Sequence, residues 1–240
     1  MSVFNWTNIR LLLMIGLVFF LYSFSLHRNE SRKLSKSAVI FVGDNALLIT
    51  PESVNKLLIE NKREASSITK EELDLNKIEK VLNEQPTIEE SQVFVTIDGV
   101  LKAVVKQKTP IARIFNTNRS FYLDSKGIEI PLSANFTARV PLVSGKINKD
   151  NNEELASVFS IIDNDSFLKK NIIAVEVMPN GSLKMLNRNF NYTIDFGRMV
   201  HVKRKFDNYK AFFQKAVLDS SLYNYKKIDL RFTQQVVCTK

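Results

Sequence analysis

The side chains that could perform covalent chemistry are few and lie far apart along the chain. The sequence has one cysteine, Cys238, and two histidines, His27 and His201. A transpeptidase-type site would use Cys238 as nucleophile, His201 as base and Arg231 as oxyanion partner. Cys238 lies two residues from the last residue of the sequence, and a terminal residue is rarely held as firmly as such a site requires. We therefore expect no catalytic residues.

The sequence also lacks the patterns that bind metals, nucleotides or phosphates. The sequence contains none of the patterns G-x-G-x-x-G, H-E-x-x-H and G-x-S-x-G, and it has no Walker loop. Its seven glycines do not cluster. A single cysteine excludes a disulfide framework and a cysteine-ligated metal site. We expect no cofactor and no metal, which leaves binding as the class of function.

The net charge of +9 is spread along the chain and is not gathered in an arginine-rich tract. Proteins that bind RNA typically combine such tracts with exposed aromatic residues. We interpret the basic residues as a solvated surface and expect no nucleic acid partner. An anionic membrane surface is the other partner that this charge allows.

An uncharged apolar stretch of sixteen residues, 11–26, follows Arg10 near the N-terminus. With Ile9 and the Arg10 stem it approaches the ~20 residues that a helix needs to cross ~30 Å of hydrocarbon. A cleaved signal peptide would end in a small-residue site, which residues 25–28 lack. We predict a tail and transmembrane helix over residues 1–26, a lipid contact through that helix, and a polar linker over residues 27–36.

The charges around this segment leave its orientation open. Arg28, Arg32 and Lys33 follow the span, and positively charged flanks usually remain in the cytoplasm. A long domain also follows the span, and long domains cross the membrane largely regardless of charge.

Residues 37–108 predict one small domain with the element order strand, helix, helix, strand, strand. Thr50 and Pro51 are typical of the first residues of a helix, and Thr69 with the acidic residues after it is typical of a second start. Asp98-Gly99 is typical of a two-residue hairpin turn of type I′, because both positions tolerate a positive φ.

Residues 109–240 predict a β-rich domain with two helices, so that the whole chain is of the α+β class. The helices are expected over residues 151–162 and 202–218, where apolar residues repeat at helical spacing. The strands are shorter runs separated by turn residues: 111–115, 120–123, 128–131, 140–143, 172–178, 182–186, 190–196, 227–231 and 234–237.

The last of these strands is the candidate binding element. A strand that is last in sequence often lies at a sheet edge, where unpaired main-chain groups can accept a strand from a partner. Charged side chains on the edge would oppose the addition of a partner strand, but Val236 and Val237 are apolar. We therefore predict a docking edge formed by Gln234, Gln235, Val236 and Val237.

Three motifs, in order, resemble bacterial cell-division proteins of the FtsQ/DivIB family. The strand and turn of residues 93–101 lead into Lys108-Thr109-Pro110-Ile111-Ala112-Arg113. Phe121 to Gly127 with Ile130-Pro131 is similar to a second family segment, and Ile228-Asp229-Leu230-Arg231-Phe232 to its V-D-L-R-Y strand. Residues 37–108 resemble a POTRA domain.

This resemblance implies a non-enzymatic scaffold that recruits and links membrane proteins of the divisome at the septum. It implies an inner-membrane protein with a cytoplasmic N-terminus and a periplasmic C-terminal domain. Its partners would be FtsB- and FtsL-like coiled-coil proteins, which add a strand to the C-terminal edge. Arg231 and Phe232 match the family's partner-contacting pair, and Arg198 matches a second basic contact.

Two alternatives remain open. A POTRA-bearing factor for membrane-protein assembly or translocation would share the small domain, although it would need further POTRA repeats or a long barrel. Phe232 would alternatively be an ordinary core residue.

Overall fold

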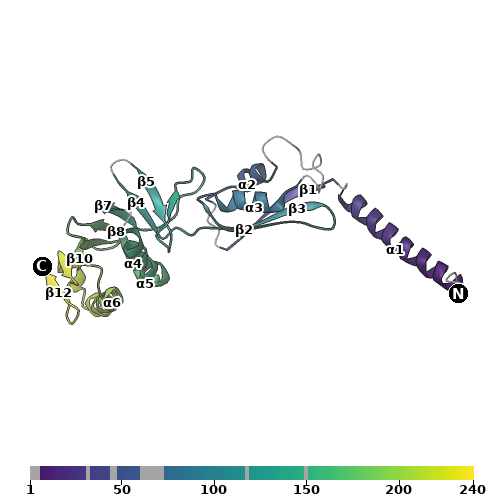
Figure 1. The fold of residues 1–240 in the computed structure, drawn as a ribbon. Helices are drawn as coiled ribbons and strands as arrows, with labels where there is room; N and C mark the ends of the chain where they lie inside the picture. Colours follow the sequence, from purple (N-terminus) through teal and green to yellow (C-terminus); the bar gives the residue numbers. More distant parts are fainter. Residues whose placement is uncertain (1–5, 31–32, 44–47, 60–72, 117–118, 149–150) are drawn as a thin grey trace. The chain divides into compact units, whose positions relative to one another are not determined.

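The computed structural model describes residues 6–30, 33–43, 48–59, 73–116, 119–148 and 151–240 (Figure 1). The chain divides into an N-terminal unit, Met1–Gly43 with Ile49–Lys106, and a C-terminal unit, Asp44–Leu48 with Gln107–Lys240. The main part of the second unit begins at Gln107, two residues before the predicted border at residue 109. The α+β class is confirmed.

Helix α1, Trp6–Glu30, contains the apolar stretch. Its portion Trp6–Arg28 is long and apolar enough to cross a membrane, and none of the side chains in that window is buried. The Arg10 guanidinium lies 5.5 Å from the centre of the Trp6 ring, a pairing suited to a membrane interface. The helix runs four residues beyond its predicted end, into the segment expected to be a linker.

The N-terminal unit has the predicted order β1 (Lys36–Val42), α2 (Pro51–Leu58), α3 (Leu75–Asn83), β2 (Ile88–Val95) and β3 (Val100–Gln107). Its sheet has the order β1-β3-β2, with β1 parallel to β3. Thr50 caps α2 as predicted, since its side chain accepts the Ser53 N–H. Helix α3 begins after the cap Asp74, and the predicted start at Thr69 lies outside the described residues.

The hairpin between β2 and β3 is at the predicted place but has a different turn. Gly99 has a φ of +79°, whereas Asp98 has no positive φ. The Gly99 N–H donates to Thr96 O, and the Thr96 N–H donates to Val100 O. The type I′ prediction is therefore wrong, because that turn needs a positive φ at both central residues. The loop is instead a three-residue connection with glycine in the left-handed position.

The C-terminal unit is built on one sheet of nine strands in the order β12-β11-β10-β9-β8-β7-β4-β5-β6. The pairs β4·β7, β7·β8 and β10·β11 are parallel, and the other neighbours are antiparallel. The strands are β4 (Ala112–Phe115), β5 (Ser120–Leu123), β6 (Glu129–Pro131), β7 (Leu142–Gly145), β8 (Ile172–Val177), β9 (Leu183–Asn187), β10 (Thr193–Gly197), β11 (Lys227–Asp229) and β12 (Val237–Thr239).

Three α-helices accompany this sheet: α4 (Asn152–Asn164), α5 (Ser166–Asn171) and α6 (Val202–Leu218), followed by the short 3-10 helix η3 (Ser221–Asn224). Helices α4 and α6 were predicted. Helix α5 was not, because six residues are too few to show a helical period. The Asp165 carboxylate caps α5 by accepting the Phe167 and Leu168 N–H groups.

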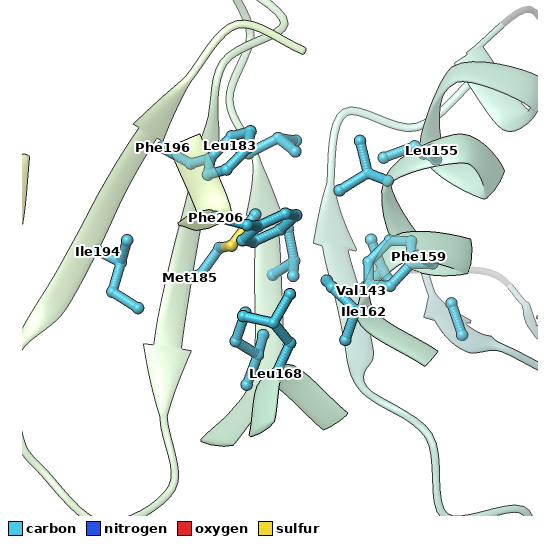
Figure 2. Packing of buried hydrophobic residues seen from close by; sticks show 14 of the residues in the cluster. Val143, Leu155, Phe159, Ile162, Leu168, Leu183, Met185, Ile194, Phe196 and Phe206 are labelled. Atoms are coloured by element: carbon cyan, nitrogen blue, oxygen red, sulfur yellow. The ribbon is translucent and has the colours of Figure 1, made fainter. Parts of the chain in front are cut away.

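The core lies between these helices and the sheet. Figure 2 shows Leu155, Phe159 and Ile162 of α4 near Val143 of β7, and Phe206 of α6 belongs to the same cluster. Because successive strand residues point to opposite faces, a second, smaller cluster forms on the other side of the sheet. It contains Leu48, Tyr122 and Ile130, and the segment that carries Phe136, Ala138 and Val140 packs against it. The Tyr122 hydroxyl accepts the Ala138 N–H at 3.1 Å, which ties this segment to the sheet.

We predict that Phe159→Ala lowers the free energy of unfolding by about 3–5 kcal/mol, because it leaves a cavity around a fully buried ring. Urea denaturation in detergent, followed by circular dichroism, measures this. Leu218→Ala is the matched control, since Leu218 is 87% exposed, and it should change the midpoint little. Equal losses in both variants would contradict the position of this core.

Candidate functional site

Strand β12 lies at one edge of the nine-stranded sheet, antiparallel to β11. Val237 is paired with Asp229, and Cys238 with Ile228. In the part of the chain that the structure describes, no strand lies beyond β12. The last strand is therefore an edge strand, as predicted.

The edge strand is shifted along the sequence relative to the prediction of residues 234–237. Gln234, Gln235 and Val236 precede β12, and Val237 alone of the four predicted residues belongs to it. The reason is a bend after Phe232. The Asn208 amide of α6 donates to Thr233 O at 3.0 Å and holds this bend, so that the chain needs more residues before pairing resumes.

The hydrogen bonds of β11 show which peptide groups face the open edge. The Leu230 N–H donates to Asp195 O of β10, so by alternation Ile228 also directs its N–H and C=O toward β10. Its partner Cys238 must then direct its own N–H and C=O away from β11. The main chain of Cys238 is thus presented at the edge, whereas Val237 and Thr239 bond within the sheet.

Arg231 lies beside this edge in an arrangement of opposite charges. Its Nε donates to Asp229 Oδ1 at 2.9 Å, and its Nη2 donates to Oδ2 at 2.5 Å. Asp195 lies 3.7 Å from the same Nε and 2.8 Å from Lys227 Nζ. A Cβ added to Gly197 would lie 2.7 Å from Arg231 Cγ, so glycine there makes room for the arginine stem.

Phe232 and Arg198 are accessible at this site. The Phe232 side chain is 48% exposed, and the Arg231 guanidinium lies 6.0 Å from its ring centre. Phe232 is therefore not a core residue, and the alternative of ordinary core packing is wrong. Arg198 is exposed and lines a groove of about 480 Å³ together with Arg231 and Lys184.

Lys205 also lines this groove, although it was not among the predicted site residues. It is 2% exposed, and its Nζ donates to the carbonyl oxygens of Phe196 (2.9 Å) and Arg198 (2.7 Å). Burial lowers the pKa of Lys205, against the opposing effect of Asp195 and Asp229. It lies four, seven and eleven residues before Tyr209, Phe212 and Ala216, so helical spacing places it on the buried face of α6. Its bonds fix the chain on both sides of Gly197.

The residues considered for catalysis do not form an activated centre. His201 is exposed at the start of α6 with a φ of +52°, and its side chain makes no capping hydrogen bond. Burial raises the pKa of the Cys238 thiol, which is the reverse of what a nucleophilic thiolate needs. Among the described residues, no group of histidine, cysteine or acidic side chains could hold a metal ion.

A fall in pH should weaken the ion pair between Arg231 and Asp229. The guanidinium hydrogen bonds lower the pKa of Asp229 below its usual 3.8. A carboxylate with a lowered folded-state pKa adds stability above its unfolded pKa, and this stability is lost as pH falls through the folded value. We predict that, below about pH 4, unfolding free energy falls less steeply in Asp229→Asn than in the unaltered chain. Urea denaturation across pH 2–6 tests this, and parallel curves would contradict it.

Comparison with known proteins identifies the family. The family model described as "FtsQ/DivIB, C-terminal related" matches residues 109–239, which is more than half of the 240 residues and nearly all of the C-terminal unit. A search of curated proteins found no match to the chain. By the extent of this match, the chain belongs to the FtsQ/DivIB, C-terminal related family.

Proposed function

We propose that the protein is a membrane-anchored, non-enzymatic scaffold of the division septum, which recruits and links other membrane proteins of the divisome. Membership of the FtsQ/DivIB-related family indicates a role in cell division. Helix α1 fits a single-pass membrane protein of this kind. In the proposed topology the N-terminus is cytoplasmic, and both units after α1 lie in the periplasm.

The proposed partners are FtsB- and FtsL-like proteins, one of which adds a strand beside β12. The observation that carries this is the outward-facing peptide group of Cys238 on an edge strand. Main-chain hydrogen bonds would supply affinity, and neighbouring side chains would supply specificity. The family match falls on the unit that contains this edge, and so favours a division scaffold over an assembly or translocation factor.

Arg231, Phe232 and Arg198 are the side chains that we propose contact the partner. A guanidinium has five N–H donors, so Arg231 can hold Asp229 and still donate to a partner carboxylate. The half-exposed Phe232 ring offers an apolar anchor next to the edge. Arg198 adds a second cation in the groove.

A proline at the edge tests strand addition. Cys238→Pro removes the outward N–H and leaves the bonds between β11 and β12, whereas Cys238→Ala shortens the same side chain and keeps the N–H. We expect Cys238→Pro to weaken binding of an FtsB-like partner by about tenfold, the effect of one lost hydrogen bond. Affinity is measured by biolayer interferometry with the full chain in nanodiscs. Equal binding by the proline and alanine variants would rule out this edge.

The proposed topology predicts that protease added to intact spheroplasts degrades the C-terminal unit. A C-terminal epitope tag should disappear on immunoblots, while a tag before Met1 remains attached to a short protected fragment. A cytoplasmic marker protein must stay intact in the same sample. Protection of the C-terminal tag until the membrane is permeabilised would overturn the periplasmic location.

A further inference from the structure

The two edges of the N-terminal sheet differ in a way that points to a second binding surface. Strand β2 forms one edge and β1 the other. On β2, the Ser91 N–H donates to Asn83 Oδ1 at 2.8 Å, and the Val93 N–H donates to Glu79 Oε2 at 3.2 Å. Asn83 and Glu79 belong to α3, so this helix already satisfies two peptide groups that an incoming strand would need. The β2 edge is therefore closed.

The orientation of the peptide groups in β1 follows from β3. Val100 accepts the Thr96 N–H and so faces β2, which leaves Leu101, Ala103 and Val105 facing β1. In a parallel pair, a residue bonds the two residues that flank its partner. Ala38 is opposite Lys102, so it bonds the flanking residues Leu101 and Ala103.

By alternation, Ser37, Val39 and Phe41 direct their N–H and C=O groups away from β3. Among the described residues, no strand lies on that side of β1 and no side chain caps these groups as α3 caps β2. Three outward residues at alternate positions provide the row of main-chain groups that strand addition uses.

The side chains on the outer face of β1 indicate what would bind. Lys36, Ala38, Ile40 and Val42 share that face, and Ile40 and Val42 are 45% and 52% exposed. Lys102 of β3 lies opposite Ala38 on the same face. Because alanine is small, Lys36 and Lys102 can both reach a carboxylate placed beside it. The other half of the strand is apolar.

We propose that β1 is a second docking edge, which accepts an extended segment of a partner protein. That segment carries a carboxylate beside Ala38 and apolar side chains beside Ile40 and Val42. A second copy of this chain fits less well, because the outer face of β1 has no acidic side chain to offer Lys36 and Lys102. At most about 20 Å of extended chain separates Glu30 from Lys36, so the segment must approach the membrane surface that holds α1.

A matched pair of variants tests this edge in the full chain in lipid nanodiscs. The probe is a fluorescein-labelled peptide, Glu-Thr-Glu-Thr-Val-Thr-Val-Thr, with binding measured by anisotropy. Ser37→Pro removes an outward N–H without touching the bonds to β3, and Ser37→Ala keeps it. We expect about tenfold weaker binding for Ser37→Pro alone, and no binding of a peptide N-methylated at alternate residues. Absence of binding to the unaltered chain, or equal binding by both variants, would overturn the proposal.

Three more variants distinguish peptide binding at β1 from binding at β12 and from self-association. Cys238→Pro should leave peptide binding unchanged, so the β12 proposal can fail without affecting this one. Lys102→Glu should weaken binding of the glutamate peptide and favour a lysine version of it. Ile40→Cys in a Cys238→Ala background should remain monomeric under oxidation. A disulfide-linked dimer would assign the edge to a second copy and refute the partner model.

Discussion

A strand at the edge of a sheet leaves every second peptide group without a partner in the sheet, and this constraint underlies both binding surfaces proposed for the protein. Such a group must be capped within the chain, left in water, or paired with another polypeptide. The edges at β1, β2 and β12 meet this constraint differently. Helix α3 caps β2 through Asn83 and Glu79, whereas the outward groups of β1 and β12 face away from their sheets. The main-chain groups that we propose bond a partner therefore lie on two short strands, β1 and β12.

Ion pairs within the chain hold the charged side chains near β12 in place. Asp229 and Asp195 lie on adjacent strands and would repel each other, but Lys227 and Arg231 lie within ion-pairing distance. The guanidinium is held by Asp229 at a fixed angle, and its stem passes over Gly197. In the proposed complex, Arg231 would then lose less side-chain entropy than an arginine without such ion pairs.

Sequence reasoning succeeded where a local pattern determines structure. Thr50 and Pro51 start α2, and the apolar repeat of residues 202–218 gives α6 with the predicted bounds. It failed where tertiary contacts decide. The Asn208 contact to Thr233 displaces β12 along the chain, and Lys205 is buried at a position where only the carbonyls of β10 and its loop can satisfy it. The edge position of the last strand could be predicted from the sequence. The direction of each peptide group could not, because it depends on how the strand is aligned with its neighbours in the sheet.

The closed edge of β2 also limits how far sheets can grow through the N-terminal unit. A domain with two open edges can accept a strand on one side and offer one on the other, which permits fibres to propagate. In this unit Asn83 and Glu79 cap the β2 edge, so a copy that accepts a strand at β1 cannot offer β2 to a further chain. At the division septum, where we propose that the protein acts, this closed edge would prevent copies of the N-terminal unit from propagating a sheet from one to the next.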